Sequence, residues 1–244
     1  SAFDTIDDGQ SPADVLLVDE GQDLLNLDCL SSINELVAGG FDEGRWRWFM
    51  DDNNQSGVTG WQTKEGREHL FTGGAAPTIV PLRFNVRNTK EIANKVQLWT
   101  GADIGESQVA GYGSDPNLVE YEDSEELVGC VEKTVNDLQN DDIGLEEIGM
   151  ILPDDDETDI LSLLPKRLRK KIVPLDVNTV RMNLQNRLVW GTAGQFKGLE
   201  RPVMLAIGFD QPRFLEERLS EFYVAVTRGN YSLWLFVSRQ FRER

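Results

Sequence analysis

The sequence predicts an α/β protein whose mostly parallel sheets are flanked by helices. Short apolar runs of strand length alternate with segments in which apolar residues recur every three or four positions. This alternation is typical of parallel sheets, because each crossover between parallel strands needs a connecting segment that is usually a helix. With 244 residues, 40% of them apolar, the chain is long enough for two modest domains, each with its own buried core.

Two apolar strands in the first part of the chain each end in acidic or polar residues. The first strand is expected over residues 14–18 and leads directly into Asp19 and Glu20, and the second lies in the run RWRWFMDDNNQ. A helix is expected over residues 29–37, closed by two glycines. Residues 56–77 are rich in glycine, threonine and polar side chains, which predicts loops with a short helix.

The second part of the chain continues the alternation of strands and helices from residue 78. Asn88 is followed three residues later by Glu91, a capping-box spacing that predicts a helix opening at Asn88. Asp123 and Glu126 repeat this spacing at the start of another helix. Strands are expected over 79–82, 119–121, 148–152, 188–190, 203–207 and 233–237, and helices over 161–169, interrupted at Pro165, and over 214–226.

Composition and charge exclude several classes of protein. No apolar run approaches the roughly 20 residues that span a bilayer, so we expect no membrane contact and a cytoplasmic location. Two cysteines and the single histidine, His69, argue against a disulfide framework and against His-rich metal or triad chemistry. The net charge of −18 lowers the expectation of nucleic-acid binding, but net charge describes long-range fields rather than a local groove.

The run VLLVDEGQD has the form of a Walker B strand. It would place Asp19 at the carboxyl end of a parallel strand, where it can hold Mg²⁺, and Glu20 beside it, where it can orient or deprotonate a water molecule. A bare Asp-Glu pair more often marks only the point where a strand reaches solvent. The longer run Asp-Glu-Gly-Gln-Asp is far more specific.

VLLVDEGQD resembles motif II of the UvrD/Rep-type superfamily 1 DNA helicases, and four further stretches follow in the order of that family's motifs. FMDDNNQ resembles motif III, LRFNVRNTKEIA motif IV, GTAGQFKGLERPVM motif V, and FYVAVTRG motif VI. The resemblance covers most of the chain. It implies RecA-like domains of the P-loop NTPase type: the C-terminal part of a first domain over residues 1–77 and a complete second domain over residues 78–244.

The resemblance also implies an ATP site, with Mg²⁺ held at Asp19. By their motif positions, Gln55 would sense the γ-phosphate, Arg87 and Arg228 would reach it as arginine fingers, and Glu200 would meet the sugar of the nucleotide. Guanidinium groups suit this task, because phosphoryl transfer spreads negative charge over the γ-phosphate oxygens. Taken alone, Arg228 would be only a cation at the end of its helix.

For single-stranded DNA, with RNA as the alternative, the resemblance implies contacts from motif V. Thr192 and the neighbouring backbone would touch the strand, whereas Gly194 stands where the family usually has a histidine. Asp51, in motif III, likewise stands where the family usually has glycine. Trp61 lies about where the family places an aromatic side chain that meets a base, although a packing role is the commoner one.

The phosphate-binding loop G-x-x-x-x-G-K-[ST] does not occur in the sequence. We therefore expect this chain by itself to hydrolyse ATP poorly or not at all, and expect the N-terminal half of the motor as its partner. One alternative is a helicase-like binding module that contacts nucleic acid or protein without turnover. Another is an unrelated P-loop enzyme with a Walker B strand, which the ordered motifs disfavour.

Overall fold

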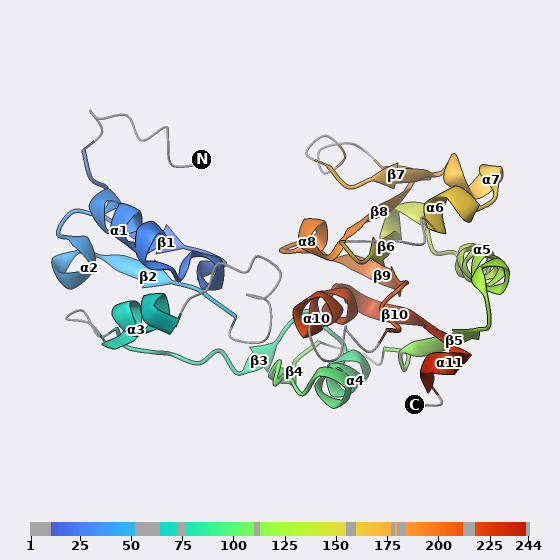
Figure 1. The fold of residues 1–244 in the computed structure, drawn as a ribbon, viewed down its shortest axis with the longest axis horizontal. Coiled ribbons are helices and arrows are strands. Elements are labelled where there is room, and N and C mark those ends of the chain that lie inside the picture. The colour runs from blue at the N-terminus through green and yellow to red at the C-terminus, as the bar shows by residue number, and fades with distance from the viewer. Residues whose placement is uncertain are drawn as a thin grey trace. The chain divides into compact units, whose positions relative to one another are not determined.

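The computed structural model of the chain describes residues 11–51, 64–72, 77–109, 113–154, 160–176, 179, 184–211 and 218–242. It forms two compact units, residues 1–81 and 82–244, divided four residues beyond the boundary that the sequence predicts. Figure 1 shows the elements of both units. None of the helices in this described part of the chain is both long and apolar enough to cross a membrane.

The first unit is built around a parallel pair of short strands. Strand β1 (Leu16–Val18) pairs with β2 (Trp46–Trp48), with Leu16 opposite Trp46. Between and after them lie the 3-10 helix η1 (Gly21–Leu24) and the helices α1 (Leu27–Leu36), α2 (Gly40–Glu43) and α3 (Lys64–Thr72). The core of this unit consists of Val18, Leu25, Cys29, Leu30, Ile33, Phe41 and Leu70.

The second unit contains a six-stranded parallel sheet in the order β5-β10-β9-β6-β8-β7. It thereby has the α/β architecture that the sequence predicts, consistent with a RecA-like domain. Its strands are β5 (Asn117–Tyr121), β6 (Ile148–Leu152), β7 (Ile172–Pro174), β8 (Leu188–Thr192), β9 (Arg201–Ala206) and β10 (Gly229–Ser238), beside a small pair, β3 (Phe84–Asn85) and β4 (Glu106–Ser107).

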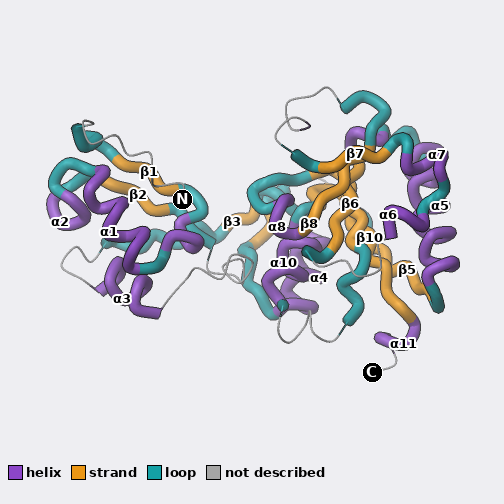
Figure 2. Tube along the Cα trace, turned by 45° about the horizontal axis from the view of Figure 1, so that its top comes forward, coloured by secondary structure: helices purple, strands orange, loops and turns teal. Residues whose placement is uncertain are grey.

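Helices cover both faces of this sheet, as Figures 1 and 2 show. On one face lie α5 (Ser124–Asn140), α6 (Ile160–Leu163) and α7 (Lys166–Arg169); on the other lie α4 (Lys90–Thr100), α8 (Ala193–Phe196) and α10 (Leu219–Thr227), with α11 (Arg239–Arg242) after β10. Every residue of β6 is buried, because a parallel strand covered on both faces needs a continuous apolar run.

Local signals placed the start of α5 correctly, whereas the helix start predicted at residue 214 lies outside the described residues. Asp123 caps α5 by accepting hydrogen bonds from the backbone of Glu125 and Glu126, as its spacing predicts. Helix α4 begins at Lys90 with Thr89 as its N-cap, so the prediction that Asn88 opens this helix is wrong by one residue. The side chain of Asn88 instead donates to backbone carbonyls at the end of α10 and the start of β10.

Three predictions about strands are corrected. Residues 79–82 form no strand: Ile79 is 71% exposed and Leu82 84% exposed, and Pro81 has no N–H to donate to a ladder. Strand β7 was not anticipated, because three residues at a sheet edge give too short a pattern. Strand β10 begins at Gly229, four residues before the predicted start, because it continues directly from α10.

Leu205 and Leu118 offer a matched test of this core. Leu205 lies near the carboxyl end of β9, a central strand of the sheet, and is fully buried, whereas Leu118 lies on the edge strand β5 and is 53% exposed. Leu205→Ala should lower the free energy of unfolding by about 2–5 kcal/mol, because it leaves a cavity between the sheet and α5. Leu118→Ala should lower the free energy of unfolding by less than half as much. Urea titration of both variants would measure the two losses. Equal losses for the two variants would contradict this packing.

Candidate functional site

In the first unit, the predicted Mg²⁺ and water-activating carboxylates lie at the carboxyl end of β1, as the Walker B pattern predicts. Asp19 is exposed, and its Oδ1 accepts a hydrogen bond of 2.9 Å from the backbone N–H of Glu20. Glu20 adopts left-handed backbone angles, φ 51° and ψ 36°, which are unfavourable for a residue with a Cβ. Such strain is found at functional sites when the surroundings hold it in place.

Gln22 supplies that support. It is fully buried, and its Nε2 donates to Glu20 Oε2 at 2.6 Å while its Oε1 accepts from the backbone N–H of Asp51 at 3.1 Å. One neutral side chain therefore joins motif II to the start of motif III. Gly21 is required beside it, since a Cβ there would lie 1.9 Å from Nε1 of Trp48.

In the second unit, the structure brings together the side chains of two predicted nucleotide residues, Arg87 and Glu200, and the backbone of a third, Arg228. Arg87 donates from Nε to Glu200 Oε2 at 2.7 Å, although 113 residues separate them in the chain. The other oxygen of Glu200 accepts from Asn230 Nδ2 at 3.1 Å. The side chains of Arg87 and Glu200 are 38% and 45% exposed, so solvent and ligands can reach this pair.

Arg228, the third of these residues, follows the last residue of α10 and is buried, with 1% exposure. Its carbonyl accepts a hydrogen bond of 3.0 Å from the backbone N–H of Arg201, next to Glu200. Arg201 begins β9 and pairs with Gly229, the first residue of β10. The predicted nucleotide residues of this unit therefore gather at the amino edge of the parallel sheet.

The predicted nucleic-acid residues lie at the opposite, carboxyl edge. Thr192 ends β8 and caps α8, accepting from the backbone of Gln195 at 3.4 Å. The N–H of Gly194 donates to Asp154 Oδ1 at 3.1 Å, so a carboxylate occupies the space next to this position. The six residues of β9, at about 3.3 Å each, put the two edges roughly 20 Å apart.

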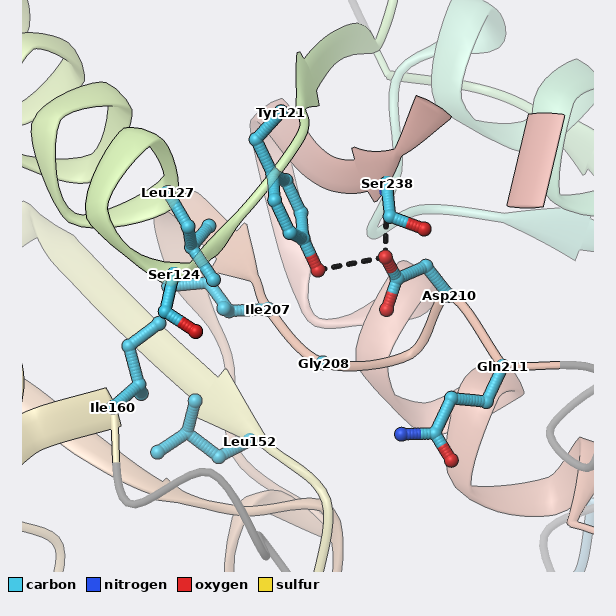
Figure 3. Close-up of a pocket in the computed structure, with 10 residues that line it drawn as sticks. All are labelled: Tyr121, Ser124, Leu127, Leu152, Ile160, Ile207, Gly208, Asp210, Gln211 and Ser238. Carbon is cyan, nitrogen blue, oxygen red and sulfur yellow. Dashed lines mark hydrogen bonds between the residues drawn. The ribbon is translucent and has the colours of Figure 1, made fainter. Parts of the chain in front are cut away.

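A pocket of about 250 Å³ also opens at the carboxyl edge, as Figure 3 shows. Asp210 Oδ2 accepts from the Tyr121 hydroxyl at 2.7 Å and from the backbone N–H of Ser238 at 2.6 Å. Burial, together with the neighbouring Asp210 carboxylate, raises the pKa of Tyr121 far above its usual value. Since these polar groups satisfy one another, they explain how the loop after β9 is fastened to the ends of β5 and β10. The lining is completed by Ser124, Leu127, Leu152, Ile160, Ile207, Gly208 and Gln211.

The remaining predicted site features are Gln55, Trp61 and the Mg²⁺ site at Asp19. Gln55 and Trp61 lie outside the described residues. Among the residues that are described, no group of three or more His, Cys, Asp or Glu side chains could by itself hold a metal ion. One exposed carboxylate at Asp19 nevertheless fits Mg²⁺, which commonly takes one or two carboxylates together with water and phosphate oxygens.

The sequence alone did not single out Gln22, Asn88 or Asn230 as functional residues. Gln22 stands inside the motif II run, and its polarity within a buried stretch is the only signal that pointed to it. Asn88 carries the signal of a helix cap, and Asn230 follows motif VI with no signal of its own. Each of them bonds to a partner about 30 or more residues away, which no local pattern can reveal.

Solved structures that are similar to this chain include two that are described as helicases. The chain is similar to the C-terminal domain of a possible DNA helicase from Lactobacillus plantarum WCFS1, with 16% identity and a TM-score of 0.49 over 63% of this chain and 88% of that one. It is also similar to the PRRSV nsp10 helicase, with 11% identity and a TM-score of 0.29 over 95% of this chain and 51% of that one. No protein-family model and no curated protein matches it. The fold class rests on the six-stranded parallel sheet itself.

Gln22 can be tested as the support of Glu20. Gln22→Met keeps the length of the side chain but removes both hydrogen bonds, and should lower the free energy of unfolding of the first unit by about 1–3 kcal/mol. Urea denaturation followed by tryptophan fluorescence would measure this loss. Ser32→Ala, which removes one exposed hydroxyl bond within α1, is the control and should change stability by less than about 0.5 kcal/mol. Equal values for both variants would contradict the bridging role.

Proposed function

We propose that this chain is part of an ATP-dependent motor of the UvrD/Rep-type superfamily 1 helicases that moves along single-stranded DNA. In this proposal, Asp19 holds Mg²⁺ and Glu20 orients the attacking water, while Arg87 and Arg228 stabilise the charge that develops on the transferred phosphoryl group. Glu200 contacts the sugar of the nucleotide. ATP hydrolysis is coupled to strand movement through the RecA-like domains.

One observation carries the proposal: residues from motifs IV, V and VI meet at one edge of one sheet. Arg87 bonds to Glu200, and the backbone that carries Arg228 bonds to the residue after Glu200. An unrelated fold would have no reason to collect two arginines and a carboxylate from positions 87, 200 and 228. The assembly supports a site that recognises a phosphate chain and its sugar.

The pairing of Arg87 with Glu200 is compatible with nucleotide binding on energetic grounds. An exposed ion pair contributes only about 0–1 kcal/mol, so little free energy is lost when the pair opens. A phosphate that reaches Arg87 can therefore replace Glu200 as its partner. Glu200 would then be released toward the sugar, which is the role that its motif position implies.

A binding module without turnover is the second candidate, and two contacts at the carboxyl edge favour it. At the carboxyl edge, the Asp154 carboxylate faces Gly194, and the hydroxyl of Thr192 is already engaged in capping α8. Both features weaken the contacts that a translocating motor would make with a phosphate backbone. Turnover measurements separate the two candidates.

The decisive experiment is an ATPase assay on the longest in-frame protein that contains this chain, with and without single-stranded DNA. We expect hydrolysis that DNA stimulates, and that falls by about 10³-fold or more in Arg228→Ala, the effect expected for an arginine finger. Glu20→Gln should abolish turnover while leaving nucleotide binding intact. Binding of DNA or protein without any hydrolysis would support the binding module instead.

Asp154 gives a separate test of the nucleic-acid edge. Asp154→Asn keeps the acceptor for Gly194 but removes a negative charge, so binding of a labelled single-stranded oligonucleotide should tighten several-fold at low salt. Fluorescence anisotropy at two salt concentrations would measure this gain. Asp142→Asn, in the exposed turn after α5, removes a charge elsewhere on the same unit and is the control. The same gain in both variants would mean that only net charge matters.

A further inference from the structure

Asn88 is the most deeply buried polar residue of the motif IV region. It is 2% exposed, although its position before α4 would suit an exposed helix cap. Its carbonyl accepts from the Ser107 hydroxyl at 2.8 Å, and its side-chain amide turns away from α4 toward the end of α10. A buried amide keeps its place only when its hydrogen bonds are made, so its partners show what it holds.

The amide of Asn88 holds the backbone on either side of Arg228. Its Nδ2 donates to Thr227 O at 3.0 Å and to Gly229 O at 2.7 Å. The carbonyl of Arg228 itself, between these two, accepts from Arg201 N. The carbonyls of Thr227 and Arg228 lie at the end of α10, where no intrahelical donor remains, and Gly229 begins β10, so the position of this backbone depends on donors from elsewhere in the fold.

The same residue is also fixed to Arg87, the other candidate arginine. Asn85 Oδ1 accepts from the N–H groups of Arg87 at 2.8 Å and Asn88 at 2.9 Å, and Asn85 Nδ2 donates to Asn88 Oδ1 at 3.2 Å. One residue further, Thr89 N donates to Asn230 O at 3.2 Å. The backbone that carries Arg87 is thus bound to the backbone that carries Arg228.

We infer that Asn88 is a positioning residue that sets Arg87 and Arg228 relative to each other, so that both can act on one phosphate group. The inference rests on the proposed function and deepens it. A residue that only capped the start of α4 would need no bond to the end of α10. Asn88 instead bonds to carbonyls on both sides of Arg228, and the turn that carries Arg87 holds it in place. Displacement of a catalytic group by about 1 Å can cost on the order of 100-fold in rate.

The test uses the longest in-frame protein that contains this chain and shows ATPase activity. Asn88→Ala should lower kcat by about 10- to 100-fold and change KM by less than about 3-fold, because the arginines act on the transition state. Asn88→Ser, which keeps a single donor, should fall between Ala and the unchanged protein. If Asn88→Ala does not fold, the kcat of Asn88→Ser tests the inference in its place.

Thr100→Val is the matched control, because Thr100 is a buried polar residue at the far end of α4, the helix that follows Asn88. Its hydroxyl donates to Val96 O at 2.7 Å within α4 and touches neither arginine. A comparable loss of thermal stability with unchanged kcat is expected for this variant. If Thr100→Val lowers kcat as much as Asn88→Ala does, Asn88 acts only through the stability of the unit.

A double-mutant cycle with Arg228→Ala completes the test. If Asn88 acts through Arg228, Asn88→Ala should lower kcat by less than about 3-fold more in the Arg228→Ala background. Full additivity of the two losses would overturn the inference while leaving the proposed function intact. Absence of turnover in the unchanged protein would overturn both, and is recognised before any variant is made.

Discussion

The parallel six-stranded sheet is the constraint on which the second unit depends. Parallel strands must be covered on both faces, which forces the chain to cross over through α5, α6 and α7 on one side and α8 and α10 on the other. Because all strands point the same way, the two edges of the sheet are different in kind. The amino edge collects Arg87, Glu200 and Arg228, and the carboxyl edge carries Thr192 and the pocket. A rigid sheet roughly 20 Å deep therefore separates the two candidate sites.

Neutral amides connect the charged residues of both units. Gln22 joins Glu20 to the backbone of Asp51, and Asn88 joins the turn of Arg87 to the backbone around Arg228. An amide donates and accepts at once, so it can be buried with its hydrogen bonds satisfied and without the desolvation cost of a charge. Residues of this kind hold charged neighbours in place at little electrostatic cost.

A carboxylate lies at each edge of the six-stranded sheet, in keeping with the acidic composition of the chain. Glu200 pairs with Arg87 at the amino edge, and Asp154 faces Gly194 at the carboxyl edge. In each case a carboxylate occupies the position where an anionic ligand would bind, so a ligand must replace it or tolerate it. Since both carboxylate contacts are exposed, their contribution is small and salt weakens it further. Under the proposed function, these local pairs matter more for phosphate binding than the net charge of −18 does.

The sequence by itself determined the fold class, most strands and the cap of α5, because these depend on neighbours a few residues apart. It also determined that β1 leads directly into Asp19 and Glu20, since the pattern of an apolar strand followed by acids is local. It misjudged residues 79–82, where apolar residues without a partner strand remain exposed, and it assigned Asn88 to a cap. Only the tertiary structure decided the pairing of Arg87 with Glu200 and the hold of Asn88 on α10. Those contacts join residues more than 100 positions apart, and the order of strands in the sheet, not any local pattern, brings them together.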